Sequence, residues 1–106
     1  MQKGDIILIP FPFTDLSGNK TRPALILAAS QTTITLAFIS TQSKWKEDTD
    51  LVLQPNAENG LKRESLVRLS KLATLDKVLA IGLLGRIGKK HIEIVNHNLK
   101  KVFLLD

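Results

Sequence analysis

Cysteine is absent from this sequence of 106 residues, and histidine occurs only twice. Disulfides and cysteine-based zinc or redox sites are therefore excluded. No apolar run approaches the ~20 residues that a membrane-spanning helix requires, and the early charges in Met1–Asp5 do not fit a secretory signal peptide. We therefore expect a soluble, cytoplasmic protein with no membrane partner.

The length predicts one domain over residues 1–106, which can bury about two thirds of the surface of its unfolded chain. Positive charge exceeds negative charge, with 15 Lys and Arg against 10 Asp and Glu, a net charge of +5. Such a balance is typical of domains that meet phosphates. A basic surface without a specific partner has the same composition, so charge alone leaves both interpretations open.

Short apolar runs predict a chain made mainly of β-strands. Residues 6–9 are apolar on both faces, as in a strand that is buried on two sides. Residues 33–38 alternate between apolar and polar, as in a strand with one face on the core. Pro10 and Pro12 are expected to stop the pairing of the first strand, and residues 14–21 to form a polar loop. Further strands are predicted at 24–29, 51–53, 65–69 and 83–87, with a turn at Asn59-Gly60.

The C-terminal segment has a helical period instead. From Lys89 onward, apolar residues recur at intervals of three and four, which predicts a helix of three to four turns. A weaker helical turn is expected within residues 74–81. Five or six strands and one helix predict a mainly β fold, a strongly curled antiparallel sheet or small barrel with the helix packed across it. The residues of the predicted apolar helix face are Ile92, Val95, Leu99, Val102 and Phe103.

Two cations, Lys20 and Arg22, precede the predicted strand 24–29. Pro23 restricts Arg22 to an extended backbone at the mouth of that strand. A guanidinium held there can make a bidentate contact to a phosphate and stabilise the charge that develops during phosphoryl transfer. An ordinary exposed arginine before a strand would produce the same short pattern.

Residues 40–46, Ser-Thr-Gln-Ser-Lys-Trp-Lys, have a composition that suits single-stranded nucleic acid. A base can stack on the Trp45 indole while the flanking lysines follow the phosphate backbone. A place for Trp45 in the core or in a dimer interface is equally compatible with the sequence. Strand alternation does not decide whether Ser40 or Thr41 faces a ligand.

The remaining ionisable residues do not form a recognisable catalytic or metal-binding pattern. His91 and His97 lie six residues apart on the predicted helix, which places them on different faces. The aspartates at 5, 15, 48 and 50 are too widely spread to suggest a two-metal centre. The sequence also lacks a P-loop, a dinucleotide fingerprint and a nucleophile elbow. We therefore expect no metal site and no cofactor.

Three blocks of the sequence resemble the MazF/PemK (Kid-like) toxins of type II toxin–antitoxin systems. Their order and spacing agree with that family over nearly the whole chain. The blocks are Gly4–Ile6 leading to Phe11-Pro12, then Lys20–Leu27, and finally Ser65–Val67 followed by Leu72–Lys77.

The resemblance implies an SH3-like barrel of five to seven antiparallel strands with a C-terminal helix. It also implies a homodimer and a metal-independent, sequence-specific endoribonuclease that cleaves single-stranded RNA, specifically mRNA, and is neutralised by an acidic antitoxin. In the family an arginine before the second strand and a threonine, sometimes serine, at the end of the third act on the scissile phosphate. Arg22 and Ser40 match these positions, and serine lacks the β-branch that restricts the rotamers of threonine.

The hypothesis is attack by the RNA 2′-hydroxyl on the adjacent phosphorus, with Arg22 stabilising the charge of the phosphorane and Ser40 orienting a phosphate oxygen. The doubly apolar first strand and the C-terminal helix offer surfaces for a dimer. Two alternatives remain, a catalytically inactive relative that binds RNA or protein, and an SH3-like adaptor unrelated to nucleic acid. The candidates for RNA binding are Lys20, Thr41, Gln42, Lys44, Trp45, Lys46 and Lys71.

Overall fold

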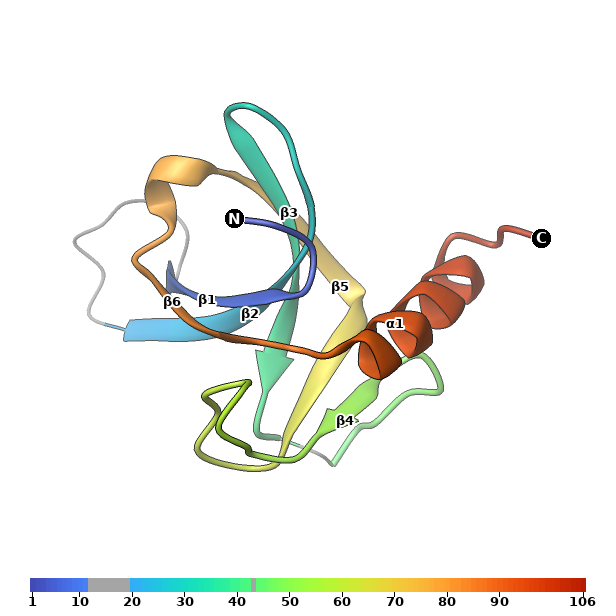
Figure 1. Ribbon diagram of the computed structural model, residues 1–106. Coiled ribbons are helices and arrows are strands. Elements are labelled where there is room, and N and C mark those ends of the chain that lie inside the picture. Colours follow the sequence, from blue (N-terminus) through green and yellow to red (C-terminus); the bar gives the residue numbers. More distant parts are fainter. Residues whose placement is uncertain (12–19, 43) are drawn as a thin grey trace.

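The computed structural model describes residues 1–11, 20–42 and 44–106, which form a curled antiparallel sheet with one α-helix (Figure 1). The order across the sheet is β4-β5-β3-β2-β1-β6, so that β4 and β6 are its edges. This half-barrel with a C-terminal helix confirms the predicted mainly β fold. The elements are β1 (Asp5–Phe11), β2 (Lys20–Ala29), β3 (Thr33–Ser40), β4 (Leu51–Leu53), β5 (Ser65–Asp76), a 3₁₀ turn η1 (Lys77–Leu79), β6 (Gly82–Arg86) and α1 (Lys89–Val102).

Both faces of the sheet are buried, because consecutive residues of the central strands enter different apolar clusters. In β2, Leu25 belongs to the cluster beneath α1, whereas Ile26 belongs to the cluster on the opposite face. In β1, Ile6 and Ile7 divide in the same way and are almost completely buried. Burial of each such side chain contributes about 1.5–3 kcal/mol. The expectation that the first strand is buried on two sides is therefore confirmed.

The helix α1 packs one face on the sheet, as its period predicted. Val95 is buried in the cluster beneath the helix, and Ile92, Leu99 and Val102 pack against it while partly buried. Phe103 follows the helix and is 54% exposed, so its predicted place on the packed face is wrong. Among the described residues, no helix is long and apolar enough to cross a membrane.

The first strand continues through Pro10, where the sequence predicted an end to pairing. Pro10 lies opposite Thr21 and Phe11 lies opposite Lys20 in the β1–β2 ladder. Beyond Leu8 the strand β1 has no further partner in β6, so one side of the strand lacks a ladder at Pro10 and a missing donor is tolerated there. The predicted loop 14–21 is thus wrong at its last two residues, while residues 14–19, like Pro12, lie outside the described residues.

The strand β5 is longer than the predicted run 65–69. Its pairing with β3 shifts between Ala37, which faces Leu72, and Phe38, which faces Arg68. This bulge inserts polar residues that interrupt the alternation, but the strand continues beyond them to Asp76. The helical turn predicted within 74–81 is confined to η1, since residues 74–76 still belong to the strand.

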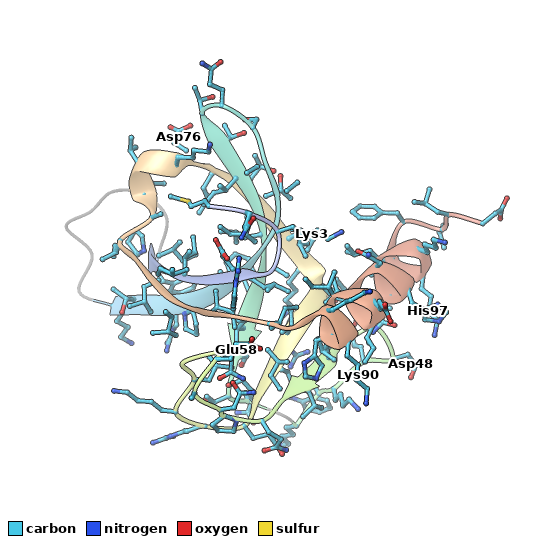
Figure 2. All side chains as sticks on the ribbon, viewed as in Figure 1. Lys3, Asp48, Glu58, Asp76, Lys90 and His97 are labelled. Carbon is cyan, nitrogen blue, oxygen red and sulfur yellow. The ribbon has the colours of Figure 1, made fainter. Side chains whose placement is uncertain are left out.

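The half-barrel is closed by a turn after β4 that lies directly against β6. The Arg86 N–H donates to the Glu58 carbonyl at 2.9 Å, and Figure 2 shows Glu58 beside this strand. A Cβ atom on Gly85 would lie 2.4 Å from the Glu58 oxygen, and one on Gly60 would lie 2.2 Å from the Leu84 oxygen. Gly60 also has φ +69°, a conformation that favours glycine. The predicted Asn59-Gly60 turn therefore closes the half-barrel.

We expect Gly85→Ala to destabilise the fold, because its methyl group would collide with the backbone of the facing turn. Overpacking of this kind costs about 1–3 kcal/mol, which lowers Tm by about 4–8 °C for each kcal/mol. Thermal denaturation followed by circular dichroism measures the change. Gly82→Ala, in the same strand, is the matched control because its Cβ would meet nothing within 4 Å. Equal Tm values for the two variants would contradict the closure.

Candidate active site

A cavity of about 690 Å³ opens where β2 and β3 reach the same edge of the half-barrel. It brings together both residues predicted to act on a phosphate, Arg22 and Ser40. The cavity is lined by Phe11, Arg22, Pro23, Phe38, Ile39, Ser40, Thr41, Gln42, Trp45, Ser65, Arg68 and Lys71.

The pairing of β2 with β3 explains why Arg22 and Ser40 meet. Ala24 lies opposite Phe38 in this antiparallel ladder. The paired residues end there, and Arg22 and Ser40 each lie two residues further along their strands in the same direction, at the cavity. Because side chains alternate along a strand, both residues project on the same side of the sheet as Phe38. The convergence follows from the pairing of the two strands.

The Arg22 guanidinium lies over an aromatic ring at the mouth of the cavity. Its Cζ is 5.9 Å from the centroid of Phe11, within range of a cation–π contact of about 0.5–1 kcal/mol at an exposed site. Arg22 is exposed, and no carboxylate of the described residues pairs with it. Its charge is therefore available to an anion in the cavity.

The hydroxyl of Ser40 has a defined orientation at the end of β3. Its Oγ accepts the Gln42 N–H at 3.0 Å, which leaves the hydroxyl hydrogen for an acceptor in the cavity. Thr41 also lines the cavity and is exposed. Both hydroxyl residues therefore border the cavity, Ser40 as the last residue of β3 and Thr41 as the first residue after it.

Trp45 is a surface residue and forms one wall of the cavity. Its side chain is 70% exposed, and the Lys44 Nζ lies 5.5 Å from its ring centroid. This exposure rules out burial in the core of the monomer, one of the two places the sequence allowed. An exposed indole beside an ammonium group can stack on an unpaired base while the cation approaches a phosphate.

The structure gathers some of the predicted RNA-binding residues at the cavity and leaves others beside it. Thr41, Gln42, Trp45 and Lys71 line the cavity. Lys20, Lys44 and Lys46 are exposed but do not line it.

The histidines and the helix lysines do not line the cavity. Figure 2 shows Lys90 and His97 projecting from α1. Neither residue contributes to the site, as expected for the histidines.

Sequence reasoning missed two residues that shape the cavity. Phe11 was used only as part of a family motif, yet its ring lies beneath the Arg22 guanidinium. Arg68 lies in the apolar run of β5, where it is only 7% exposed and pairs with Asp50, with 3.4 Å between Nη1 and Oδ2. A charged residue inside an apolar strand signals a buried partner, but the sequence cannot name one 18 positions away.

These features define a small half-barrel protein with an open cavity lined by cations and hydroxyls. The sequence profile of PemK-like, MazF-like toxins of type II toxin–antitoxin systems matches residues 2–103. The chain therefore belongs to the PemK/MazF toxin family. None of the curated proteins compared with this sequence matches it.

Solved structures with the same fold include toxins and toxin complexes. The toxin MazF-mt6 of Mycobacterium tuberculosis is 22% identical, with a TM-score of 0.78 over 96% of this chain and 98% of that one. A mycobacterial endoribonuclease in complex with its cognate antitoxin is 16% identical, with a TM-score of 0.78 over 100% and 97%. The MazE–MazF complex of Deinococcus radiodurans is also 16% identical, with a TM-score of 0.78 over 100% of this chain and 97% of that one. At these identities the likeness establishes the fold.

Proposed function

We propose that this toxin is an endoribonuclease that cleaves single-stranded mRNA at short sequences in the cytoplasm. The observation that carries the proposal is the shared cavity of Arg22 and Ser40. It holds an oriented hydroxyl and a guanidinium that no carboxylate of the described residues pairs with. Family membership and the endoribonuclease among the similar structures support the same activity.

In the proposed reaction the RNA 2′-oxygen attacks the adjacent phosphorus and the bond from phosphorus to O5′ breaks. The products are a 2′,3′-cyclic phosphate and a 5′-hydroxyl, with one proton lost from the 2′-oxygen and one gained by O5′. Arg22 stabilises the negative charge of the phosphorane, and Ser40 donates its hydroxyl hydrogen to a phosphate oxygen. Both groups are held before substrate arrives, Arg22 over Phe11 and Ser40 by Gln42.

The donor set of the cavity suits a reaction that needs no metal ion. Among the described residues, its charged lining residues are the cations Arg22, Arg68 and Lys71, and its lining includes no carboxylate and no histidine. Hard divalent cations prefer carboxylate and carbonyl oxygens, whereas this set favours a phosphate.

Replacement of Arg22 by alanine should reduce RNA cleavage by a hundredfold or more, because the phosphorane loses its preorganised cationic donor. Single-turnover cleavage of a mixed-sequence RNA, measured in EDTA, gives the comparison with the wild type. Arg63→Ala, which removes an exposed arginine outside the cavity, is the matched control and should retain wild-type activity. Retention of activity in Arg22→Ala, or loss of wild-type activity in EDTA, would refute the mechanism.

The cations around the cavity form the proposed track for the RNA backbone. Arg22 and Lys71 line the cavity, and the exposed Lys20, Lys44 and Lys46 extend from β2 and from the loop after β3. Trp45 provides a stacking surface between them, and the side chains of Thr41 and Gln42 offer hydrogen bonds to exposed base edges.

RNA binding should weaken steeply as salt increases. Each phosphate neutralised on a single strand contributes about −0.7 to the slope of log K against log salt, so five engaged cations give about −3 to −4. Fluorescence anisotropy with a labelled, 2′-O-methylated single strand measures this slope without cleavage. The paired change Lys44→Gln and Lys46→Gln should make the slope shallower by about 1.4. A wild-type slope near zero would contradict the track.

The same basic surface is the proposed site for an acidic antitoxin segment. The similar structures from Mycobacterium and Deinococcus include complexes of their toxins with an antitoxin. A net charge of +5 favours an acidic partner, which would cover the cations that RNA requires.

A homodimer is the proposed assembly, and the end of α1 is its most suitable surface. The strand β1 is buried within the monomer and offers no face. In contrast, Phe103, Leu104 and Leu105 are 54%, 88% and 62% exposed. Leu104 also has φ +58° in the reverse turn that ends the helix, where glycine would be unstrained. A strained, exposed leucine at this position is expected where its side chain meets a partner.

Sedimentation equilibrium at micromolar concentration should therefore give about twice the chain mass of 11.7 kDa. Phe103→Glu should shift the protein toward the monomer, because it places a charge in the apolar surface at the helix end. Lys100→Glu, an exposed change in the last turn of the same helix, controls for charge alone. A wild-type protein that sediments as a monomer would overturn the assembly.

A further inference from the structure

The loop between β3 and β4 spans residues 41–50, and its described residues, 41–42 and 44–50, form one wall of the cavity without regular structure. It contributes Thr41, Gln42 and Trp45 to the lining, yet its described residues from 44 to 48 are all exposed. Such a segment buries too little apolar surface to hold its own conformation. Its position must therefore be fixed by contacts from neighbouring elements.

Arg68 reaches this loop from the buried side. Its Nη1 donates to the Trp45 carbonyl at 3.0 Å, and its Nη2 donates to the Gln42 carbonyl at 3.4 Å. Arg68 lies at the bulge where β5 shifts its pairing with β3, so its backbone is anchored in the sheet. A single planar guanidinium thus binds two points of the loop at once.

Asp50 fixes the guanidinium from the far end of the same loop. Its Oδ2 lies 3.4 Å from Arg68 Nη1 and accepts the Glu47 N–H at 2.8 Å. The Asp50 side chain is fully buried, and its Oδ1 has no hydrogen-bond partner among the described residues. The charged form of the Asp50 carboxylate is stabilised by its ion pair with Arg68, because loss of Arg68 would leave an unpaired charge buried in the protein.

Within the part of the chain that the structure describes, the remaining side-chain tethers reach the second half of the loop. Ser70 Oγ donates to Glu47 Oε2 at 3.0 Å, and Asn98 Nδ2 donates to the Thr49 carbonyl at 3.3 Å. The half that carries Trp45 is joined to the body of the sheet through Arg68 and, at its start, through the Gln42 N–H bond to Ser40. Arg68 is therefore the contact that determines where Trp45 stands.

Two arginines line the cavity, and their surroundings assign them different roles. Arg22 is exposed and has no carboxylate partner among the described residues. The Arg68 side chain is 9% exposed, its charge is balanced by Asp50, and both of its terminal nitrogens already donate to the protein. A phosphate in the cavity could therefore bind the Arg22 guanidinium, whereas the Arg68 guanidinium is already bound to Asp50 and to two backbone carbonyls.

We propose that Arg68 is a positioning residue, which, with Asp50, holds the loop 41–50 so that Trp45 and Gln42 form the RNA-binding wall. Arg68 acts through the backbone carbonyls of these two residues and does not contact the reacting phosphate. This role rests on the proposed function, because the wall is argued to bind RNA. If Arg68 has this role, its substitution should weaken RNA binding strongly and slow the chemical step only slightly.

Trp45 makes the position of the loop directly measurable, because the chain has one tryptophan and no tyrosine. Arg68→Lys keeps a cation beside Asp50 but replaces the planar fork, whose two terminal nitrogens reach the two carbonyls, by a single nitrogen. We expect this variant to change acrylamide quenching of Trp45 and lower its fluorescence anisotropy, while its circular dichroism stays like that of the wild type. KM for RNA should rise about tenfold, with kcat within about threefold of the wild type.

A second variant removes the charge on both partners, Arg68→Met with Asp50→Asn, so that no buried ion is left alone. It should show the same change at Trp45 and the same rise in KM. The matched control is Arg86→Lys, which alters the other ion pair of the described residues, to Asp5, outside the cavity. It should leave quenching, KM and kcat at wild-type values.

Three results would overturn the role of Arg68. One is wild-type Trp45 quenching and anisotropy in both variants. Another is a hundredfold loss of kcat with unchanged KM, which would place Arg68 at the phosphate. The third is an equal rise in KM in Arg86→Lys. The quenching is measured without RNA, so a failure of the proposed function, in which the wild type neither binds nor cleaves RNA, is recognised separately.

Discussion

The antiparallel ladder between β2 and β3 is the constraint on which the site depends. Both strands bury side chains on both faces of the sheet, and a slip of one residue would exchange the residues that fill the two apolar clusters. The same two strands continue beyond their last pair, Ala24 and Phe38, and bring Arg22 and Ser40 to the cavity. The core and the placement of these two side chains therefore depend on one pair of strands.

Electrostatic organisation of the cavity follows from burial. Arg68 is committed to a buried carboxylate and two carbonyls, and it stabilises the shape of the wall. Arg22 stands over an aromatic ring in the open, and its charge remains available. The two residues have the same side-chain chemistry, and their different burial underlies the different roles proposed for them.

Much of the fold could be predicted because the sequence patterns are local. The alternation of residues 33–38 and the helical period from Lys89 depend on neighbours in the chain, and both elements were confirmed. The path of β1 through Pro10 and of β5 through its bulge could not be predicted, since each depends on what the adjacent strands provide. The pairing of Arg68 with Asp50 was missed for the same reason, as it joins separate segments. The roles of Arg22 and Ser40 stay predictions, although one cavity holds both.

The seam between β6 and the turn after β4 differs from the other junctions of the sheet. Every other junction of the sheet is a ladder of paired residues, whereas this one consists of a hydrogen bond from Arg86 to Glu58 and the close approach of Gly60 and Gly85 to bare backbone. The seam therefore depends on the close approach of two backbones, which a side chain on either glycine would prevent.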